Sequence, residues 1–314
     1  MYTRRVGDGH VLVGRNLDTG NEQILTDLRG DGSGGWEIWG HSLSPDRRRI
    51  ALASLYGPTA EDNASGLATR RIWTLDVDGT DFQRLTPVFP NSSQGRSSYS
   101  LDVSNPMWSA DGSKVVYTLS EYWYQNNQLS GGTAPWVVAA NGNSPPTNYP
   151  SQFGCAIVAY PSRNPATGEM LFLHSVCLPG SSGDGLFLYP PNGGSEPRRV
   201  LASSRVSGGV DVFLASPSWV VDGTGFVFVG STEATDWRPS VMLYNLENDT
   251  YSTLVPAPVG AAVWGAAISP TAKKLVYCLH QDSGERDLHY LDLTAQTITD
   301  VALTNDGKSC DPAF

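Results

Sequence analysis

Short runs of alternating apolar and polar residues recur along this chain at intervals of roughly 50 to 65 residues. In the clearest copy, 105–117, an apolar strand ends in Pro-x-Trp-Ser, an Asp-Gly turn follows, and a second apolar strand begins. Looser copies occupy 44–51, 164–172, 217–228 and 268–277. The alternation has the two-residue period of a half-buried β-strand, and Asp-Gly favours a tight hairpin turn. No stretch has the 3.6-residue period of an amphipathic helix.

Each hairpin is followed by two further apolar strands, so a repeat contains four strands. After the turn at Ser269 the expected strands are 275–279, 288–293 and 297–303. The unit 36–86 has the same order. A repeat of this length, built from four short antiparallel strands, is typical of one blade of a β-propeller.

The two ends of the chain are interpreted as parts of one blade. The segment 10–26 matches the third and fourth strands of a unit, and 310–314 matches an innermost strand. We therefore predict an all-β fold, in which 1–314 forms a single six-bladed β-propeller with four-stranded antiparallel blades. The C-terminal strand joins the N-terminal blade, closes the ring and removes an exposed sheet edge. The predicted blades are 1–26 with 308–314, 36–86, 99–149, 154–203, 209–255 and 261–304.

Three features together resemble the repeats of TolB-type six-bladed propellers. They are the Pro-x-Trp-Ser-x-Asp-Gly turn, Leu-Asp-x-Asp-Gly between the third and fourth strands, and Leu-Thr at the end of the fourth strand. The resemblance covers nearly the whole chain, although the turns at 164–167 and 269–272 lack Asp-Gly. It implies the fold. Because such repeats occur in periplasmic scaffolds, in propellers that gate peptidases and in some polysaccharide lyases, it does not fix a function.

Three tryptophans, Trp73, Trp108 and Trp219, occupy apolar positions of the repeat, so we expect them to be buried between blades. The net charge of −10 and the absence of a long basic run argue against nucleic acid and anionic membranes as partners. No apolar run is long enough for membrane insertion as a helix. Arg4-Arg5 is not followed by an apolar core, so we find no export signal peptide. Either the protein is cytoplasmic, or Met1 marks a trimmed mature chain.

Two of the four cysteines, Cys155 and Cys177, are equidistant from the centre of the predicted turn 164–169 and should face each other. Directly opposed residues have Cβ atoms about 4.5–5.5 Å apart, which puts a disulfide within reach. Two buried free thiols are the alternative. A bridge would indicate a periplasmic or secreted protein. Cys278 and Cys310 fall at a predicted seam between blades, and their state is left open.

The loops between second and third strands, and those between blades, are long and lie on one face of the predicted ring. Loops lengthened on one side of a rigid scaffold usually carry binding. The loop 121–134 contains Tyr122 and Trp123, and the loop 231–240 contains Trp237 and Arg238. These aromatic residues suit a protein partner, a peptide or a sugar, unless they pack down on the blades.

The mouth of the central channel is the second candidate site. Glu37 and Asp102 each lie seven residues before the serine of their turn, so they should occupy matching places in two blades. The other residues expected near this mouth are Trp39, His41, Asp211 and Trp264. Acids that converge on one axis could hold a channel cation such as calcium, or they could line an ordinary water-filled channel. No other cofactor is expected.

The sequence contains no Gly-x-Ser-x-Gly elbow and no His-x-His or His-Glu-x-x-His pair. Propeller sites are assembled from separate blades, so this absence is weak evidence against catalysis. The leading hypothesis is a non-catalytic binding scaffold that presents its loop-rich face to a protein or peptide. The alternative is a glycan-active propeller, either a lectin or a polysaccharide lyase. A lyase would need a base such as His41 or His280 and a cation.

Overall fold

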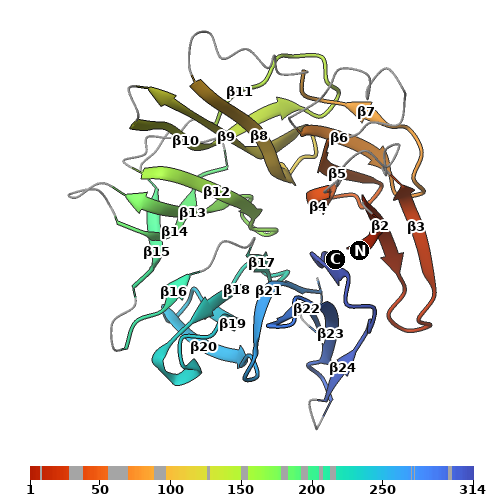
Figure 1. Cartoon of the computed structure of the whole chain (residues 1–314), viewed down its shortest axis with the longest axis vertical. Helices are drawn as coiled ribbons and strands as arrows, with labels where there is room; N and C mark the ends of the chain where they lie inside the picture. The colour runs from red at the N-terminus through yellow and green to blue at the C-terminus, as the bar shows by residue number, and fades with distance from the viewer. Residues whose placement is uncertain are drawn as a thin grey trace.

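The computed structural model has its β-strands arranged in blade-like groups around one central axis (Figure 1). The residues that the structure describes are 1–7, 9–27, 38–55, 70–87, 97–125, 128–149, 155–177, 183–191, 197–204, 208–212, 217–269, 271, 273–295 and 299–314. Within these residues the only helix is the short 3₁₀ turn η1 (Glu233–Thr235), so the described fold is all-β, as the sequence predicts.

Five sheets contain the described strands, and within each group successive strands run antiparallel. The first sheet comprises β25 (Ser309–Cys310), β1 (Tyr2–Val6), β2 (Gly9–Arg15) and β3 (Glu22–Asp27). The second comprises β4 (Ile38–Leu43), β5 (Arg49–Ser54), β6 (Arg71–Asp76) and β7 (Gln83–Arg84). The third comprises β21 (Ala261–Ile268), β22 (Lys274–Gln281), β23 (Arg286–Asp292) and β24 (Asp300–Ala302).

In the fourth sheet two short strands both pair with the same neighbour. They are β16 (Asp211–Val212) and β17 (Ser218–Trp219), followed by β18 (Gly225–Ser231), β19 (Ser240–Asn245) and β20 (Thr250–Val255). The fifth sheet has eight strands. They are β8 (Ser97–Trp108), β9 (Lys114–Gln125), β10 (Gln128–Ala139), β11 (Thr147–Asn148), β12 (Cys155–Arg163), β13 (Met170–Cys177), β14 (Gly185–Tyr189) and β15 (Arg198–Ala202).

The sequence predicts six separate sheets, whereas the described strands form five. The difference arises at one parallel contact, where Thr133 of β10 pairs with Ile157 of β12. This single pairing joins β8–β11 and β12–β15 into one sheet. A second difference concerns 121–134, predicted as a loop. Most of it belongs to β9 and β10, which continue as a long hairpin because Tyr122 and Trp123 pair with Gly131 and Ser130.

The repeated turn serine closes the first hairpin of a blade. The backbone N–H of Lys114 donates to Ser109 Oγ at 3.0 Å, and Ser109 Oγ in turn donates to Asp111 Oδ1 at 2.6 Å. Ser44 accepts from the Arg49 N–H at 2.9 Å in the same way. The Ser-x-Asp signature is therefore a local hydrogen-bonding device, in which short polar side chains bond backbone groups a few residues away and stabilise the turn.

The cores lie between neighbouring blades. Trp73, Trp108 and Trp219 are 2%, 2% and 7% exposed, which confirms the predicted burial. Trp108 packs with Ala51 and Ile72 of the preceding blade. Its indole N–H donates to the Ser42 carbonyl oxygen at 3.3 Å, so the indole keeps a hydrogen bond while its ring fills the interblade core.

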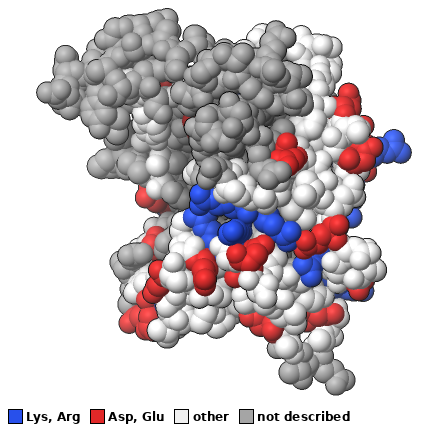
Figure 2. Space-filling view, turned by 45° about the vertical axis from the view of Figure 1, so that its right-hand side comes forward, with Lys and Arg blue, Asp and Glu red and all other residues white. Residues whose placement is uncertain are grey.

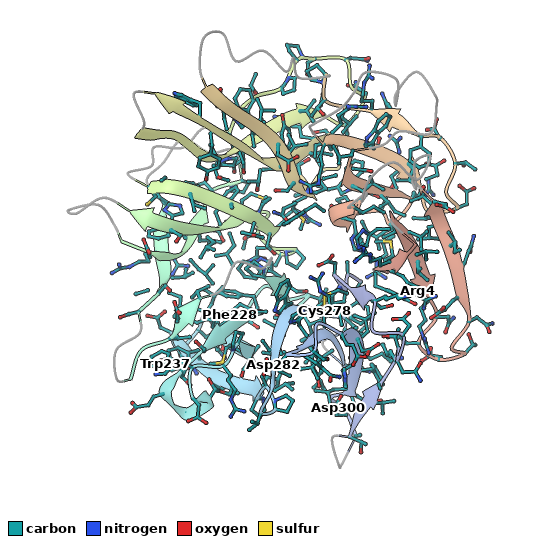
Figure 3. The ribbon with its side chains drawn as sticks, in the orientation of Figure 1. Arg4, Phe228, Trp237, Cys278, Asp282 and Asp300 are labelled. Atoms are coloured by element: carbon teal, nitrogen blue, oxygen red, sulfur yellow. A yellow bond between two sulfur atoms is a disulfide. The ribbon has the colours of Figure 1, made fainter. Side chains whose placement is uncertain are left out.

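Strand β25 closes the ring by pairing with β1, as predicted for the C-terminal strand. The contact continues beyond the strand, because the Met1 ammonium donates to the Ala313 carbonyl oxygen at 2.7 Å and the Ala313 N–H donates to the Met1 carbonyl oxygen at 2.9 Å. A disulfide joins Cys310 to Cys278 of β22, in the preceding sheet (Figure 3). The sequence left that pair open. The closure is therefore held by hydrogen bonds and by a covalent bond.

The second predicted bridge lies in the β12–β13 hairpin. Cys155 and Cys177 are directly opposed in the register, as the sequence predicts, and Cys155 is disulfide-bonded. The Cys177 side chain lies outside the described residues, so the rest of that prediction is not described.

We expect the Cys278→Ala/Cys310→Ala variant to lose about 3 kcal/mol of unfolding free energy, because the bridge closes a long loop of the unfolded chain. Urea denaturation without reductant measures this loss. The variant keeps the cysteines of the β12–β13 hairpin. Any loss of stability can therefore be assigned to the Cys278–Cys310 bridge alone. An unchanged urea midpoint would show that β25 holds the ring without covalent help.

Candidate functional site

The innermost strands of four blades bend at the same place. Each carries one extra residue relative to its neighbouring strand, which is a β-bulge. The register shifts fall between Ile38 and His41, Ser104 and Met107, Ala159 and Ser162, and Val263 and Gly265. The backbone is left-handed at Gly40 (φ 82°), Asn105 (φ 50°) and Tyr160 (φ 58°). Bulges re-aim side chains and are frequent beside functional sites, and a left-handed backbone is costly for a bulky residue such as Tyr160.

One of these bulges requires glycine. A Cβ built on Gly40 would stand 2.9 Å from the Cα of Asn105, so the backbones of two neighbouring blades approach too closely for a side chain. Asp311, just beyond β25, also has a left-handed backbone (φ 51°). It lines the same cavity as Gly40, Asn105 and Tyr160, on the blade that closes the ring. The bulges therefore face a common axis.

A cavity of about 290 Å³ lies at this axis, and residues of four different sheets contribute to its wall. Its size is at the lower end of the range for small-ligand sites. The residues that the argument below uses are Trp39, His41, Asn105, Tyr160, Trp264, Arg286 and Asp311. Three of them, Trp39, His41 and Trp264, are among the site residues predicted from the sequence.

Trp39 forms one wall of the cavity and is 44% exposed. The guanidinium carbon of Arg70 lies over its ring at 4.6 Å. Arg70 also forms an ion pair with Asp102, whose Oδ1 accepts from the Arg70 backbone N–H at 3.1 Å. Burial raises the pKa of Asp102 although Arg70 opposes the rise. Trp39, Arg70 and Asp102 also line an adjoining cavity of about 220 Å³.

Trp264 forms another wall and is 49% exposed. The guanidinium carbon of Arg286 lies over its ring at 4.7 Å, and the His280 ring stacks on it with centroids 4.3 Å apart. A stacked cation polarises and orients an indole without removing its edge from contact with a ligand. Two exposed tryptophans, each carrying an arginine, thus border one concave site.

His41 lies between this cavity and a second axial cavity of about 350 Å³. Both ring nitrogens are shielded from solvent and, within the described residues, have no hydrogen-bond partner. Burial, and secondarily the Met1 ammonium, lowers the pKa of His41 to about 3. The imidazole is therefore neutral at pH 7, and one nitrogen is available as a hydrogen-bond acceptor or base for a group that enters the channel.

Of the remaining predicted residues, those that the structure describes do not border the axial cavity. Tyr122 is half-buried and its hydroxyl bonds Thr133 Oγ1 at 2.9 Å. Trp123 follows it on β9. Asp211 accepts from Ser203 Oγ at 3.1 Å. Glu37 lies outside the described residues.

Trp237 and Arg238 also lie away from the axis. Trp237 is half-buried and lies toward the rim of the ring (Figure 3), where the 3₁₀ turn ends. The guanidinium of Arg238 folds back on that turn, with Nε donating to the Thr235 carbonyl oxygen at 3.2 Å. The Arg238 side chain therefore packs against its own loop.

Sequence reasoning missed the two arginines over the tryptophans. A signal for them exists in the repeat, because Arg70 and Arg286 each lie six residues before the aspartate that ends the third strand, Asp76 or Asp292. The left-handed residues Asn105 and Tyr160 likewise lie four residues before the first residue of their turn.

Within the described residues, no group of three or more His, Cys, Asp and Glu side chains could hold a metal ion. No described helix is long and apolar enough to cross a membrane. On the face shown in Figure 2, Lys and Arg gather in one band with Asp and Glu around it. Arg4 and Arg15 pair with Glu22 at 3.0 and 2.8 Å, so basic residues of the outer surface are partly neutralised by ion pairs.

Neither a family model nor a curated protein matches this chain. Among solved structures it is similar to TolB from Acinetobacter baumannii, with a TM-score of 0.65 and 14% identity over 99% of this chain and 65% of that one. The putative TolB from Agrobacterium tumefaciens has a TM-score of 0.58 and 13% identity over 94% and 88% of the two chains. An oligogalacturonate lyase in complex with manganese has a TM-score of 0.54 and 15% identity over 93% and 70%.

This chain therefore spans slightly less than two thirds of the length of the Acinetobacter protein. At such low identities the likeness shows the propeller fold alone. It supports the TolB-like arrangement that the repeats suggest, and it includes both a TolB and a lyase.

We expect stability to fall as the pH drops from about 6.5 toward 4, because two buried histidines must stay neutral in the folded protein. Burial lowers the pKa of His174 to about 4 and that of His41 to about 3, whereas in the unfolded chain both protonate near pH 6.5. The unfolded state therefore binds more protons in this window and is favoured on acidification.

Urea denaturation of wild type, His41→Phe and His174→Phe at pH 7.5 and pH 4.5 measures the effect. Each variant should lose roughly 2–3 kcal/mol less than wild type between the two pH values, because the folded and unfolded pKa values differ by more than two units. The difference between pH values is compared, because His174→Phe also removes a hydrogen bond to Tyr189. Equal acid losses in all three proteins would contradict the neutral assignment.

Proposed function

We propose that this chain is a six-bladed TolB-like propeller that binds a protein or peptide partner at the mouth of its ring axis. Counting six blades treats β8–β11 and β12–β15 as two blades joined at Thr133 and Ile157. The recurrence of a similar parallel contact between Arg286 and Lys308, across another seam, supports that count.

The observation that carries the binding proposal is the pair of exposed tryptophans at the axial cavity. Trp39 and Trp264 leave 44% and 49% of their surface exposed in a concave site, although most large apolar side chains of this protein are buried. Trp and Arg are enriched among the residues that dominate protein interfaces. The cavity measures about 290 Å³, which suits the insertion of one or two side chains of a partner.

The alternative is a glycan-active propeller, either a lectin or a lyase. Two observations favour it. Aromatic walls also stack on sugar rings, and the neutral ring of His41 has, in the part of the chain that the structure describes, no hydrogen-bond partner for either nitrogen. A lyase would further need a cation, such as calcium, near the channel acids. Among the predicted acids of the mouth that the structure describes, Asp102 beside the axial site is already paired with Arg70, which disfavours a cation there.

We further propose that the protein works in an oxidising compartment, the periplasm or the cell exterior. The Cys278–Cys310 bridge and the oxidised Cys155 support this, because such bonds rarely persist in a reducing cytosol. Disulfides and the axial site are thus compatible with a scaffold that meets partners outside the cytoplasm.

We expect Trp39→Ala and Trp264→Ala each to weaken binding of a peptide partner by about 2 kcal/mol or more, as for interface hot spots. Hits from a combined peptide and glycan array, followed by calorimetric titration, supply the measurement. The melting temperature should stay nearly unchanged, because neither ring is buried in a core.

Trp237→Ala is the matched control, since that ring lies away from the axial cavity. It should leave peptide affinity unchanged. Array hits confined to glycans, or equal losses for all three variants, would contradict the proposed site.

A further inference from the structure

The two tryptophan–arginine pairs of the axial site occupy matching positions in two blades. Trp39 and Trp264 each lie five residues before the serine that opens their hairpin turn. Arg70 immediately precedes the third strand of its blade, β6, and Arg286 is the first residue of the third strand of the other, β23. The two guanidinium-to-ring distances, 4.6 and 4.7 Å, are nearly the same. The repeat has therefore built one arrangement twice around the same cavity.

In the first arrangement, the charge of the arginine is neutralised by an acid of the same chain. The Arg70 guanidinium forms an ion pair with Asp102, which comes from the innermost strand of the next blade along the chain. The same carboxylate accepts the Arg70 backbone N–H. Stacking on Trp39 occupies a face of the guanidinium, and the carboxylate takes N–H donors at its edge.

The second arrangement lacks that carboxylate. Asp102 lies three residues before the left-handed Asn105, and the residue three before the left-handed Asp311 is Lys308. Lys308 pairs with Arg286 in an isolated parallel bridge, so it stands at the seam where Asp102 stands in the other blade. A second cation thus replaces the acid.

No described residue compensates for this replacement. The Arg286 guanidinium makes no hydrogen bond or ion pair within the described part of the chain, and neither does the exposed Lys308 ammonium. The nearby Asp287 is engaged by Thr304 Oγ1 at 3.0 Å and by the Gly307 N–H at 3.1 Å.

The positive charge of Arg286 also affects the pKa of His280, which stacks on the same tryptophan. Burial, and after it Arg286, lowers the pKa of His280, with Asp282 opposing. In a protein of net charge −10, Arg286 and Lys308 are therefore two cations that have no acidic partner among the described residues and that a ligand could neutralise.

We propose that the axial site binds an acidic peptide, whose Asp or Glu carboxylate pairs with Arg286 and Lys308 and so takes the place that Asp102 holds beside Arg70. This inference rests on the proposed peptide-binding function and names the chemistry of the partner. The stacked guanidinium presents its N–H groups in one plane, which matches the two oxygens of a carboxylate. The exposed edge of Trp264 is left for apolar atoms of the same peptide.

The test is an array of synthetic peptides in which every sequence is present twice, once with its Asp and Glu and once with Asn and Gln instead. Wild type should prefer the acidic forms by about 10-fold or more, the usual value of a charge-assisted pair. Arg286→Gln should remove that preference. So should Lys308→Asp, which supplies Arg286 with an acid from its own chain.

Arg48→Gln is the matched control, because it removes one exposed positive charge that lies in another blade and does not line the axial cavity. It should keep the preference. Thermal melts check folding, and Lys308→Asp should melt no lower than wild type because it adds a pairing instead of removing one.

The outcomes separate this inference from the function on which it rests. If wild type binds the acidic and amide forms equally, or if both variants keep the preference, the carboxylate inference is wrong and peptide binding stands. If wild type binds no peptide in either form but binds galacturonate or neutral oligosaccharides, both the inference and the proposed function fail, and the glycan alternative replaces them.

Discussion

The pairing of the two chain ends is the interaction on which the rest of this structure depends. A ring of blades is stable only when its last seam closes, because an open ring exposes one sheet edge and one interblade core to water. Here β25 supplies that closure, and the Cys278–Cys310 bond fixes it to the preceding blade. Cys310 and Asp311 also line the axial cavity, so the same contact that completes the fold completes the site.

The bulges explain how repeated strands produce a cavity that is lined by aromatic and polar side chains. In a regular strand, side chains alternate between the two faces, which in a propeller are covered by neighbouring blades. One extra residue changes that alternation and turns a side chain or a backbone group toward the axis. The left-handed backbone at Tyr160 is unfavourable for such a residue. It persists because the strands on both sides are fixed by their own ladders.

The features that the sequence predicted correctly are those set by neighbours along the chain. The hairpin turns depend on a serine and an aspartate two residues apart, and the facing of Cys155 and Cys177 follows from the symmetry of one hairpin. Contacts across seams have no such local signal. The Cys278–Cys310 bond and the Arg70–Asp102 pair each join different blades, and the prediction left the first open and did not see the second. The aromatic stretch at Tyr122 was interpreted as a loop because its polar neighbours hide the strand pairing.

In a propeller, each blade contains equivalent backbone positions. Function then depends on the blades in which such a position carries a residue different from that in the other blades. The guanidinium of Arg70 compensates part of the cost of burying the Asp102 carboxylate, whose pKa burial still raises, and the pair joins two blades. At the matching seam, Lys308 stands opposite Arg286, and within the described residues neither cation has an acidic partner. Such an arrangement adds no ion pair to the fold. The arrangement is explained if a bound ligand supplies the negative charge. A ligand carboxylate that pairs with both cations would then contribute to the free energy of binding, as Asp102 contributes a partner to Arg70 inside the fold.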